Sequence, residues 1–196
     1  MKSLQGTKTA ENLLKAFAGE SQATNRYLLF AEVADREGFK QIKNIFLETA
    51  DNERVHARRF YNFLVKGLEK LPADIEITAC YPVAMGTTLD NLRAAAAGEH
   101  EEWANMYPHF ADVAEEEGFP EIAKAFRWIS KAEERHEIRY NKLAENVAKG
   151  MVFKKDGKVY WKCLKCGYVH EGPEAPACCP ACEHPQAFFE LFVENY

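Results

Sequence analysis

An internal repeat constrains the fold of this chain more than any other feature of its sequence. The segment Glu32–Phe39 is matched by Asp112–Phe119, and the motif Glu53-x-x-His56 recurs as Glu133-x-x-His136, in both cases 80 residues further along the chain. A repeat of supersecondary size indicates two copies of one structural unit that stack to bury a common core. The sequence therefore predicts two similar hairpins.

The hairpins are expected to be helical. Between about residues 9 and 149 apolar residues recur at spacings of three and four, as in Leu13, Leu14 and Phe17. Gly38 and Gly118 stand where a left-handed residue would end the first helix of each pair. These signals predict four helices over about 9–36, 39–67, 88–117 and 120–149.

The connection between the two hairpins is too long for a simple turn. It runs from about Leu68 to Thr87 and contains Pro72 and Pro82, which favours a crossover along the bundle, as in ferritin-like folds. We therefore expect a mainly α fold, a ferritin-like four-helix bundle with a long crossover, followed by a small C-terminal β domain.

One residue breaks the symmetry of the repeat. Ala18-Gly-Glu20 matches Ala97-Gly-Glu99 at an offset of only 79 residues, so the third helix holds one residue more than the first between its glutamate and its glycine. An inserted residue suggests a π-bulge, a feature often found at functional sites. A kink at Pro108 that is absorbed by its neighbours is the alternative.

The composition excludes several classes of function. The chain has 30 acidic and 25 basic residues, a net charge of -5, and no long basic run, so nucleic-acid binding is not expected. Its start lacks a signal peptide, and no stretch has the length and apolarity of a membrane helix. With 47% hydrophobic residues, the sequence predicts a globular cytoplasmic protein without a membrane partner.

The repeated motif predicts a metal centre in the bundle. Glu-x-x-His places a carboxylate and an imidazole on one helix face. Two such helices and one glutamate from each of the other two are the ligand set of di-iron carboxylate bundles. A single Glu-x-x-His is more often a solvated helix face, but the repetition at equivalent places favours metal. The predicted ligands are Glu20, Glu53, His56, Glu99, Glu133 and His136.

Glu102 is a further candidate ligand, because it lies one turn beyond Glu99 whereas its counterpart in the first repeat is Ala23. Five carboxylates would then face two irons. A diferrous pair and an oxo-bridged diferric pair carry the same net charge, so the site would change oxidation state with little change in buried charge. Glu102 and His56 would compete for one iron. An ordinary surface acid is the other interpretation of Glu102.

Two tyrosines are positioned to support the ligands. Tyr27 lies two turns from Glu20, and Tyr107 lies a similar distance beyond Glu99, so either hydroxyl would orient a carboxylate. Packing with a solvated hydroxyl is the alternative. The other four histidines have no comparable partners and are not predicted to bind metal: His100, His109, His170 and His184.

The chain changes character after Gly150. Apolar and aromatic residues flank Asp156-Gly157, a hairpin turn signal. We predict two domains, residues 1–150 and 151–196. The second is too small to be stable on its own core, so a structural metal is expected.

Cysteine spacing supplies that metal site. Cys163-x-x-Cys166 and Cys179-x-x-Cys182 predict a tetrahedral thiolate centre. Zinc and iron both suit four thiolates; iron is favoured here, because an FeS4 centre would pass single electrons to a di-iron site. The remaining thiols, Cys80 and Cys178, are predicted to be free.

These motifs together, along the whole chain, resemble the rubrerythrin family. The resemblance implies a homodimeric peroxidase that reduces hydrogen peroxide to water in defence against oxidative stress. It implies that Glu53 and Glu133 bridge the irons, that Glu20 and Glu99 are terminal ligands, and that Glu102 and His56 exchange on redox change. The implied electron donor is a rubredoxin or a flavoprotein reductase supplied by NAD(P)H.

Two other classes of function stay open from the sequence. A ferritin-like protein would oxidise and store iron, which the four-cysteine tail argues against. A non-catalytic electron carrier or peroxide sensor would need no turnover.

Overall fold

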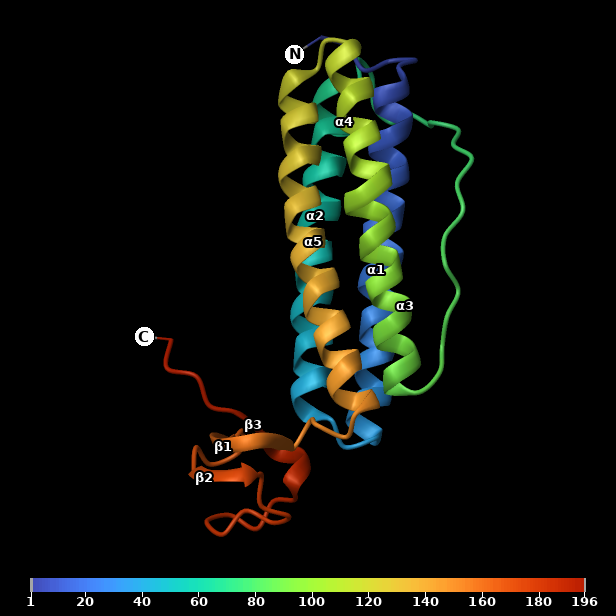
Figure 1. Ribbon diagram of the computed structural model, residues 1–196. Coiled ribbons are helices and arrows are strands. Elements are labelled where there is room, and N and C mark those ends of the chain that lie inside the picture. Colours follow the sequence, from blue (N-terminus) through green and yellow to red (C-terminus); the bar gives the residue numbers. More distant parts are fainter. Residues whose placement is uncertain (1, 196) are drawn as a thin grey trace.

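The computed structural model describes residues 2–195 and confirms the predicted fold class. Three helices are uninterrupted: α1 (Lys8–Arg36), α2 (Lys40–Gly67) and α5 (Pro120–Ala148). The fourth rod of the bundle is made of α3 (Thr88–Glu101), the π-helix η1 (Glu102–Met106) and α4 (Tyr107–Glu116) in succession. Figure 1 shows the connection between α2 and α3 running the length of the bundle beside α1 and α3, which is the predicted crossover.

The helix ends follow the repeat. Gly38 and Gly118 adopt φ of +85° and +83°, a left-handed conformation that costs glycine little and other residues more. The glutamate before each glycine caps a helix of the other hairpin. Glu117 accepts from the amides of Lys8 and Thr9, at 3.0 and 2.8 Å, and Glu37 accepts from the amide of Thr88 at 3.0 Å. Each hairpin therefore fixes the start of the other.

The inserted residue is accommodated by the π-helix η1, as predicted. The amide of Tyr107 donates to the carbonyl of Glu102, five residues back, which is the π pattern. Pro108 follows immediately, in the first turn of α4, where its missing amide hydrogen is tolerated. The rod thus accommodates one extra residue and continues as a helix from α3 through η1 into α4.

The core of the bundle divides into two aromatic clusters related by the repeat. One contains Tyr27, Phe30, Phe46 and Tyr140, and the other contains Tyr107, Phe110, Phe126 and Phe60. Each member of the first cluster except Tyr140 has its counterpart 80 residues further on in the second. The carboxylates described below come from the helix segments between these clusters, so hydrophobic burial on both sides holds them in place.

The C-terminal module is a three-stranded antiparallel sheet of order β2-β1-β3, formed by β1 (Lys154–Cys163), β2 (Val169–Glu174) and β3 (Phe189–Leu191). The predicted hairpin turn at Asp156-Gly157 is wrong, because both residues lie within β1. Lys154 pairs with Glu174 and Val159 pairs with Gly172, so extra residues of β1 form an irregularity between these pairs. The turn signal marks a bulge, and the chain reverses later, at the first cysteine pair.

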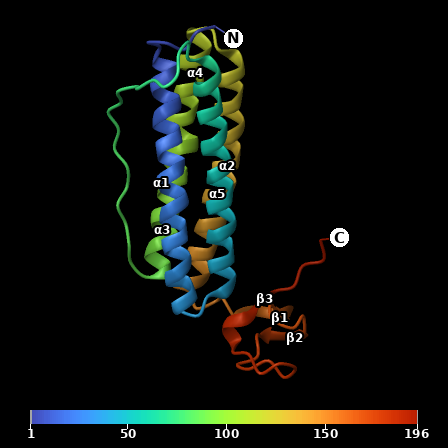
Figure 2. The same cartoon turned by 180° about the vertical axis from the view of Figure 1, so that it is seen from behind.

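The module packs against the end of the bundle where α2 begins (Figures 1 and 2). Phe153 stacks on Phe39 with ring centroids 6.2 Å apart, and Lys40 Nζ lies 5.2 Å from the centre of the Phe188 ring. Gly150, with φ of +65°, separates α5 from the module. The domain division of 1–150 and 151–196 stays a prediction. Within residues 2–195, none of the helices combines the length and apolarity needed to cross a membrane.

Candidate metal centres

The bundle brings six of the seven predicted side chains into two overlapping groups. In each group one ligand atom per residue lies within 4.8 Å of all the others. Glu53 and Glu133 belong to both groups. The first group is completed by Glu20 and His56, and the second by Glu99 and His136.

The two histidines face the shared glutamates in the same way. His56 Nδ1 lies 3.0 Å from Glu53 Oε2 and 2.9 Å from Glu133 Oε1. His136 Nδ1 lies 3.2 Å from Glu53 Oε1 and 2.8 Å from Glu133 Oε2. Each shared carboxylate thus directs one oxygen to each histidine, which is the arrangement that a ligand bridging two metal ions requires.

The hydrogen bonding of these groups fits bound metal. Several buried atoms make no hydrogen bond of suitable geometry among residues 2–195, although some lie within ion-pair distance of one another: Glu20 Oε2, Glu99 Oε2, both carboxylate oxygens of Glu133 and His136 Nδ1. Buried polar atoms without partners are rare in folded proteins and are expensive when they carry charge. Oxygen and imidazole donors around a shared pair of carboxylates suit two iron ions.

The protonation of the site shows the same need for positive charge. Burial and the nearby Glu133 raise the pKa of Glu20 well above its usual value, and burial with Glu53 raises that of Glu99 to about 8. Burial opposes the charging of His56, yet the carboxylates of Glu133 and Glu53, within 3.0 Å of its Nδ1, raise its pKa to about 9. Without metal, protons neutralise the cluster, and two cations would replace them.

The two tyrosines orient carboxylates, but each serves the opposite hairpin. Tyr27 donates to Glu99 Oε1 at 2.6 Å, and Tyr107 donates to Glu20 Oε1 at 2.5 Å. The sequence indicated the role but suggested partners on the same helix. The exchange arises because α1 and the α3–α4 rod lie side by side, with their repeats facing one another.

Glu102 is the seventh predicted residue, and it lies outside both groups. It is half-buried at the start of η1, and one of its carboxylate oxygens faces Gly19 of α1. Burial and the charge of Glu99 raise its pKa well above the usual value. The structure therefore has His56 within the cluster and Glu102 beside it, which is one of the two arrangements expected for an exchanging pair.

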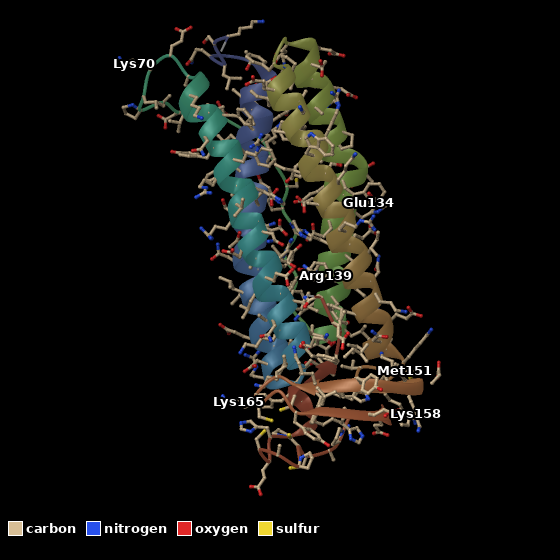
Figure 3. The ribbon with its side chains drawn as sticks, turned by 90° about the vertical axis from the view of Figure 1, so that its left-hand side faces the viewer. Lys70, Glu134, Arg139, Met151, Lys158 and Lys165 are labelled. Atoms are coloured by element: carbon tan, nitrogen blue, oxygen red, sulfur yellow. The ribbon has the colours of Figure 1, made fainter. Side chains whose placement is uncertain are left out.

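Residues near the site tie α2 to α5. Arg139, labelled between these helices in Figure 3, donates to Glu48 and Thr49 of α2 at 2.7 Å in each case. It lies one turn beyond His136, so the link holds the two Glu-x-x-His helices together. Of the histidines excluded from the prediction, His100 contacts Glu137 and His184 contacts the Cys182 carbonyl.

The four predicted cysteines of the tail form a second centre. Their sulfur atoms lie within 4.8 Å of one another, with Cys163–Cys182 at 3.8 Å and Cys166–Cys179 at 3.7 Å. A tetrahedron with metal–sulfur bonds of about 2.3 Å has edges of roughly 3.8 Å, whereas a disulfide would need about 2.05 Å. The four thiols are therefore spaced for one tetrahedral metal ion.

Each cysteine pair closes a tight turn. The amides of Gly167 and Glu183 donate to the carbonyls of Cys163 and Cys179, both at 2.9 Å. Gly167 has φ of +79° and Glu183 has φ of +58°. The sequence indicated the first turn through its glycine but not the second, where a glutamate takes the strained conformation. Cys178 and Cys80 are free and lie outside the cluster.

Sequence reasoning missed a set of residues that contact neither metal group. Arg26 of α1 and Cys80 and Tyr81 of the crossover line a cavity of about 350 Å³ next to Glu102. No spacing in the sequence identifies them, because the crossover and the helices meet only after folding.

Comparison with known proteins agrees with both centres. The rubrerythrin family profile matches residues 11–144, and the profile of the rubredoxin-like domain of rubrerythrin matches residues 161–190. The chain is 60% identical to a rubrerythrin of Clostridium perfringens over 197 residues, covering all of both chains. It is 51% identical to a rubrerythrin of Nitratidesulfovibrio vulgaris, again over the full length of both.

Solved structures support the same assignment. Fully reduced, all-ferrous nigerythrin aligns with a TM-score of 0.63 and 31% identity, covering 97% of this chain and 92% of that one. The bacterioferritin BfrA of Mycobacterium tuberculosis aligns with a TM-score of 0.63 at 20% identity, over 76% of this chain and 90% of that one, which shows the fold of the bundle alone. By its sequence, its bundle and its two candidate metal centres, the chain belongs to the rubrerythrin family.

Proposed function

We propose that the chain is a non-haem di-iron peroxidase of the cytoplasm that reduces hydrogen peroxide to water and protects against oxidative stress. Electrons would come from an NAD(P)H-linked rubredoxin or flavoprotein reductase and pass through an FeS4 centre in the tail of a homodimer. One observation carries the proposal: a buried site with room for two metal ions that share Glu53 and Glu133 occurs in the same chain as a tetrahedron of four thiolates.

The geometry supports the ligand roles that the resemblance implies. Glu53 and Glu133 would bridge the two irons, Glu20 and Glu99 would each bind one, and the Nδ1 atoms of the histidines would complete the set. Bound iron would supply the two electrons that, with two protons, convert one hydrogen peroxide into two water molecules. Delivery of both electrons at one place avoids the release of a radical.

Tyrosines hold the outer ligands in place. Burial and the charges of nearby carboxylates raise the pKa of Tyr27 and Tyr107 well above 10, so both phenols stay protonated near neutral pH. They therefore act as donors to Glu99 and Glu20. Ligating carboxylates that accept such bonds keep their orientation when the charge of the site changes.

Glu102 is the acid available to the reaction. It lies beside the cluster rather than within it, and burial raises its pKa well above the usual value. Before metal binds, burial and the negative charge of Glu99 favour the protonated form of this carboxyl group. Proton transfer from a positioned carboxylic acid is an ordinary contribution to O–O cleavage. Exchange of Glu102 with His56 would couple that proton to the oxidation state.

The tail would deliver electrons one at a time, because a single FeS4 iron changes its charge by one. It contacts the bundle at Lys40, thirteen residues before Glu53. At about 1.5 Å per residue, this places the two centres at least roughly 20 Å apart along α2. Relay over this distance is one route, and contact with the tail of the second copy in a homodimer is another.

The proposal is tested by separating single-turnover from steady-state activity. Cys182→Ser removes one corner of the thiolate tetrahedron while the bundle keeps its own core. Chemically reduced Cys182→Ser protein should still be oxidised by about one equivalent of peroxide per di-iron pair. Sustained turnover with a reductase should collapse. Cys178→Ser is the matched control, since Cys178 lies outside the cluster, and it should retain both activities.

The outcomes distinguish the alternatives. Full steady-state activity of Cys182→Ser would show that reductant reaches the bundle directly and that the tail is structural. Failure of the reduced wild-type protein to consume peroxide would remove the peroxidase proposal. Accumulation of many ferric ions per chain in a large particle would instead indicate iron storage, and a stoichiometric reaction without turnover would indicate a carrier or sensor.

A further inference from the structure

A cavity of about 350 Å³ lies between α1, the α3–η1 segment and the crossover. Glu102 forms part of its wall, and exposed residues of the crossover and of α3, among them Tyr81 and Ala97, line its outer part. Tyr81 is held against α1 by a hydrogen bond from its hydroxyl to the Lys15 carbonyl at 3.0 Å. The cavity therefore connects the surface with the one predicted ligand that lies outside the metal groups.

Arg26 gives this cavity a cationic group that makes no hydrogen bond to a side chain or backbone group of residues 2–195. Its side chain is only 8% exposed, and Nε is buried without a hydrogen-bond partner among the described residues. The guanidinium carbon lies 5.4 Å from the centre of the Tyr27 ring. Because the guanidinium lines the cavity and makes no hydrogen bond to a described residue, its accessible N–H groups are free to donate to a molecule there.

The charges around the cavity restrict what that molecule is. Glu102 shares the wall with Arg26, and Glu99 and Glu133 lie close enough to raise its pKa. An anion would be repelled by these acidic groups whenever they are ionised. A neutral group that accepts from Arg26 and donates to Glu102 satisfies both, and a hydroperoxide group, –O–O–H, has this pattern at adjacent atoms.

Much of the remaining lining is apolar, including Ala94, Ala97, Pro82 and Met106, whereas Gln22 and Glu101 add polar groups. The volume lies at the lower end of the range for small-molecule sites and is many times the roughly 30 Å³ that a water molecule occupies. Hydrogen peroxide alone would leave most of it unused. An alkyl group of a few carbons would occupy more of it and bury apolar surface.

We infer that this cavity is a substrate chamber that takes short alkyl hydroperoxides as well as hydrogen peroxide, with –O–O–H between Arg26 and Glu102 and the alkyl group among the small apolar side chains. The inference rests on the proposed peroxidase function and extends its substrate class. The O–O bond of ROOH breaks, two electrons come from the reduced iron pair, and two protons are taken up. The products are ROH and water.

Binding is tested without turnover in the whole chain loaded with zinc in place of iron, so that the probe is not consumed. Saturation-transfer NMR should detect the methyl groups of tert-butyl hydroperoxide on the wild-type protein. Ala97→Leu fills the outer part of the chamber. Gly19→Ala adds a methyl group 3.6 Å from Tyr81 Cε1 and 3.9 Å from Glu102 Oε1, ordinary contact distances in a helix that favours alanine.

Both chamber variants should raise the Kd of tert-butyl hydroperoxide about tenfold or more, and Ala148→Leu, on the exposed end of α5, should not. Arg26→Gln should weaken binding and Arg26→Lys should restore part of it. Absence of transfer to the wild-type protein, or equal transfer in wild type and both chamber variants, would overturn the inference.

Turnover by the iron-loaded protein separates this inference from the proposed function. Wild type should consume both hydrogen peroxide and tert-butyl hydroperoxide. Ala97→Leu should lower kcat/KM for the alkyl substrate at least about tenfold more than for hydrogen peroxide. If the wild-type protein consumes hydrogen peroxide but not tert-butyl hydroperoxide, the substrate-chamber inference is wrong and the proposed peroxidase function still stands. If neither peroxide is consumed, the proposed function fails, and the binding experiment alone decides the chamber.

Discussion

The two hairpins of the bundle use nearly the same residues and differ at one place that bears on chemistry. Glu20, Tyr27 and the first Glu-x-x-His have counterparts in Glu99, Tyr107 and the second. The α1 helix is regular throughout, whereas the rod from α3 to α4 passes through η1. The symmetric positions build a site for two metal ions, and the asymmetric segment adds an acid that also lines a cavity beside the site.

The extra residue of the α3–α4 rod lies between Glu99 and Tyr107, so the ligands and the tyrosines keep equivalent positions in the two hairpins. Tyr27 follows Glu20 by seven positions in the sequence, whereas Tyr107 follows Glu99 by eight. Both tyrosines nevertheless donate to a carboxylate of the opposite hairpin, at 2.6 and 2.5 Å. The wider turn of η1 absorbs the insertion between the two residues. A π-helix can therefore add a functional side chain to one copy of a repeat without displacing the residues on either side of the π-helix.

The strongest test of the asymmetry removes its side chain. Glu102→Ala should keep both irons, since six ligands remain, but should slow steady-state turnover with peroxide by roughly a hundredfold, the usual contribution of a positioned acid. Metal analysis and peroxide consumption measure the two effects. Glu116→Ala, at an exposed acidic position at the end of α4 and away from the cavity, is the control. A wild-type rate in Glu102→Ala would show that Glu102 takes no part in turnover and only lines the cavity.

Removing the inserted residue tests whether the π-helix itself matters. Deletion of Asn105, an exposed residue of η1, gives Glu99 and Tyr107 the spacing of Glu20 and Tyr27. The rod should become a regular α-helix, with its fold and thermal stability retained. Turnover should fall, but less than in Glu102→Ala, because the carboxylate is kept and only its direction changes. Circular dichroism, a crystal structure and peroxide kinetics check this prediction, which unfolding of the deletion variant would contradict.

The sequence predicted most of the fold and of the metal centres because their determinants are local. Helical spacing, the two capping glycines and the repeat suffice to place the helices and six ligands, and the CxxC pairs place the four thiols. The exchange of tyrosines between hairpins depends on which rods lie side by side, which one helix does not determine. The cavity at Arg26 depends on where the crossover passes. At Asp156-Gly157, the pairing of the flanking residues Lys154 and Val159 with β2 overrode a local turn signal.

The two tyrosines provide a matched pair for a moderate effect. Tyr27→Phe and Tyr107→Phe each delete one hydrogen bond to a buried carboxylate that is ionised when metal is bound. Each should lower the free energy of unfolding of the iron-loaded protein by about 1.5–3 kcal/mol, and by similar amounts if the hairpins are equivalent. Denaturant titration of both iron-loaded variants measures the two losses in the free energy of unfolding. If only one variant loses free energy of unfolding, the two hairpins differ in how they hold their ligands as well as in η1.

The smallest effect concerns a difference between the two aromatic clusters. Tyr140 occupies the place in one cluster that Phe60 has in the other. The Tyr140 hydroxyl is buried without a hydrogen-bond partner among residues 2–195. The neighbouring Thr49 hydroxyl already donates to the Ile45 carbonyl and accepts from Arg139.

Tyr140→Phe should therefore leave the free energy of unfolding unchanged or raise it by up to about 1 kcal/mol, because it removes an unsatisfied hydroxyl and keeps the ring. Phe60→Tyr is the reciprocal change, and it should cost about 1–3 kcal/mol by adding a hydroxyl to a fully buried apolar position. Urea titration of both variants gives the comparison. A loss of more than about 1 kcal/mol in Tyr140→Phe would show that its hydroxyl takes a share in the Thr49–Arg139 network, and the two clusters would then differ in function as well as in composition.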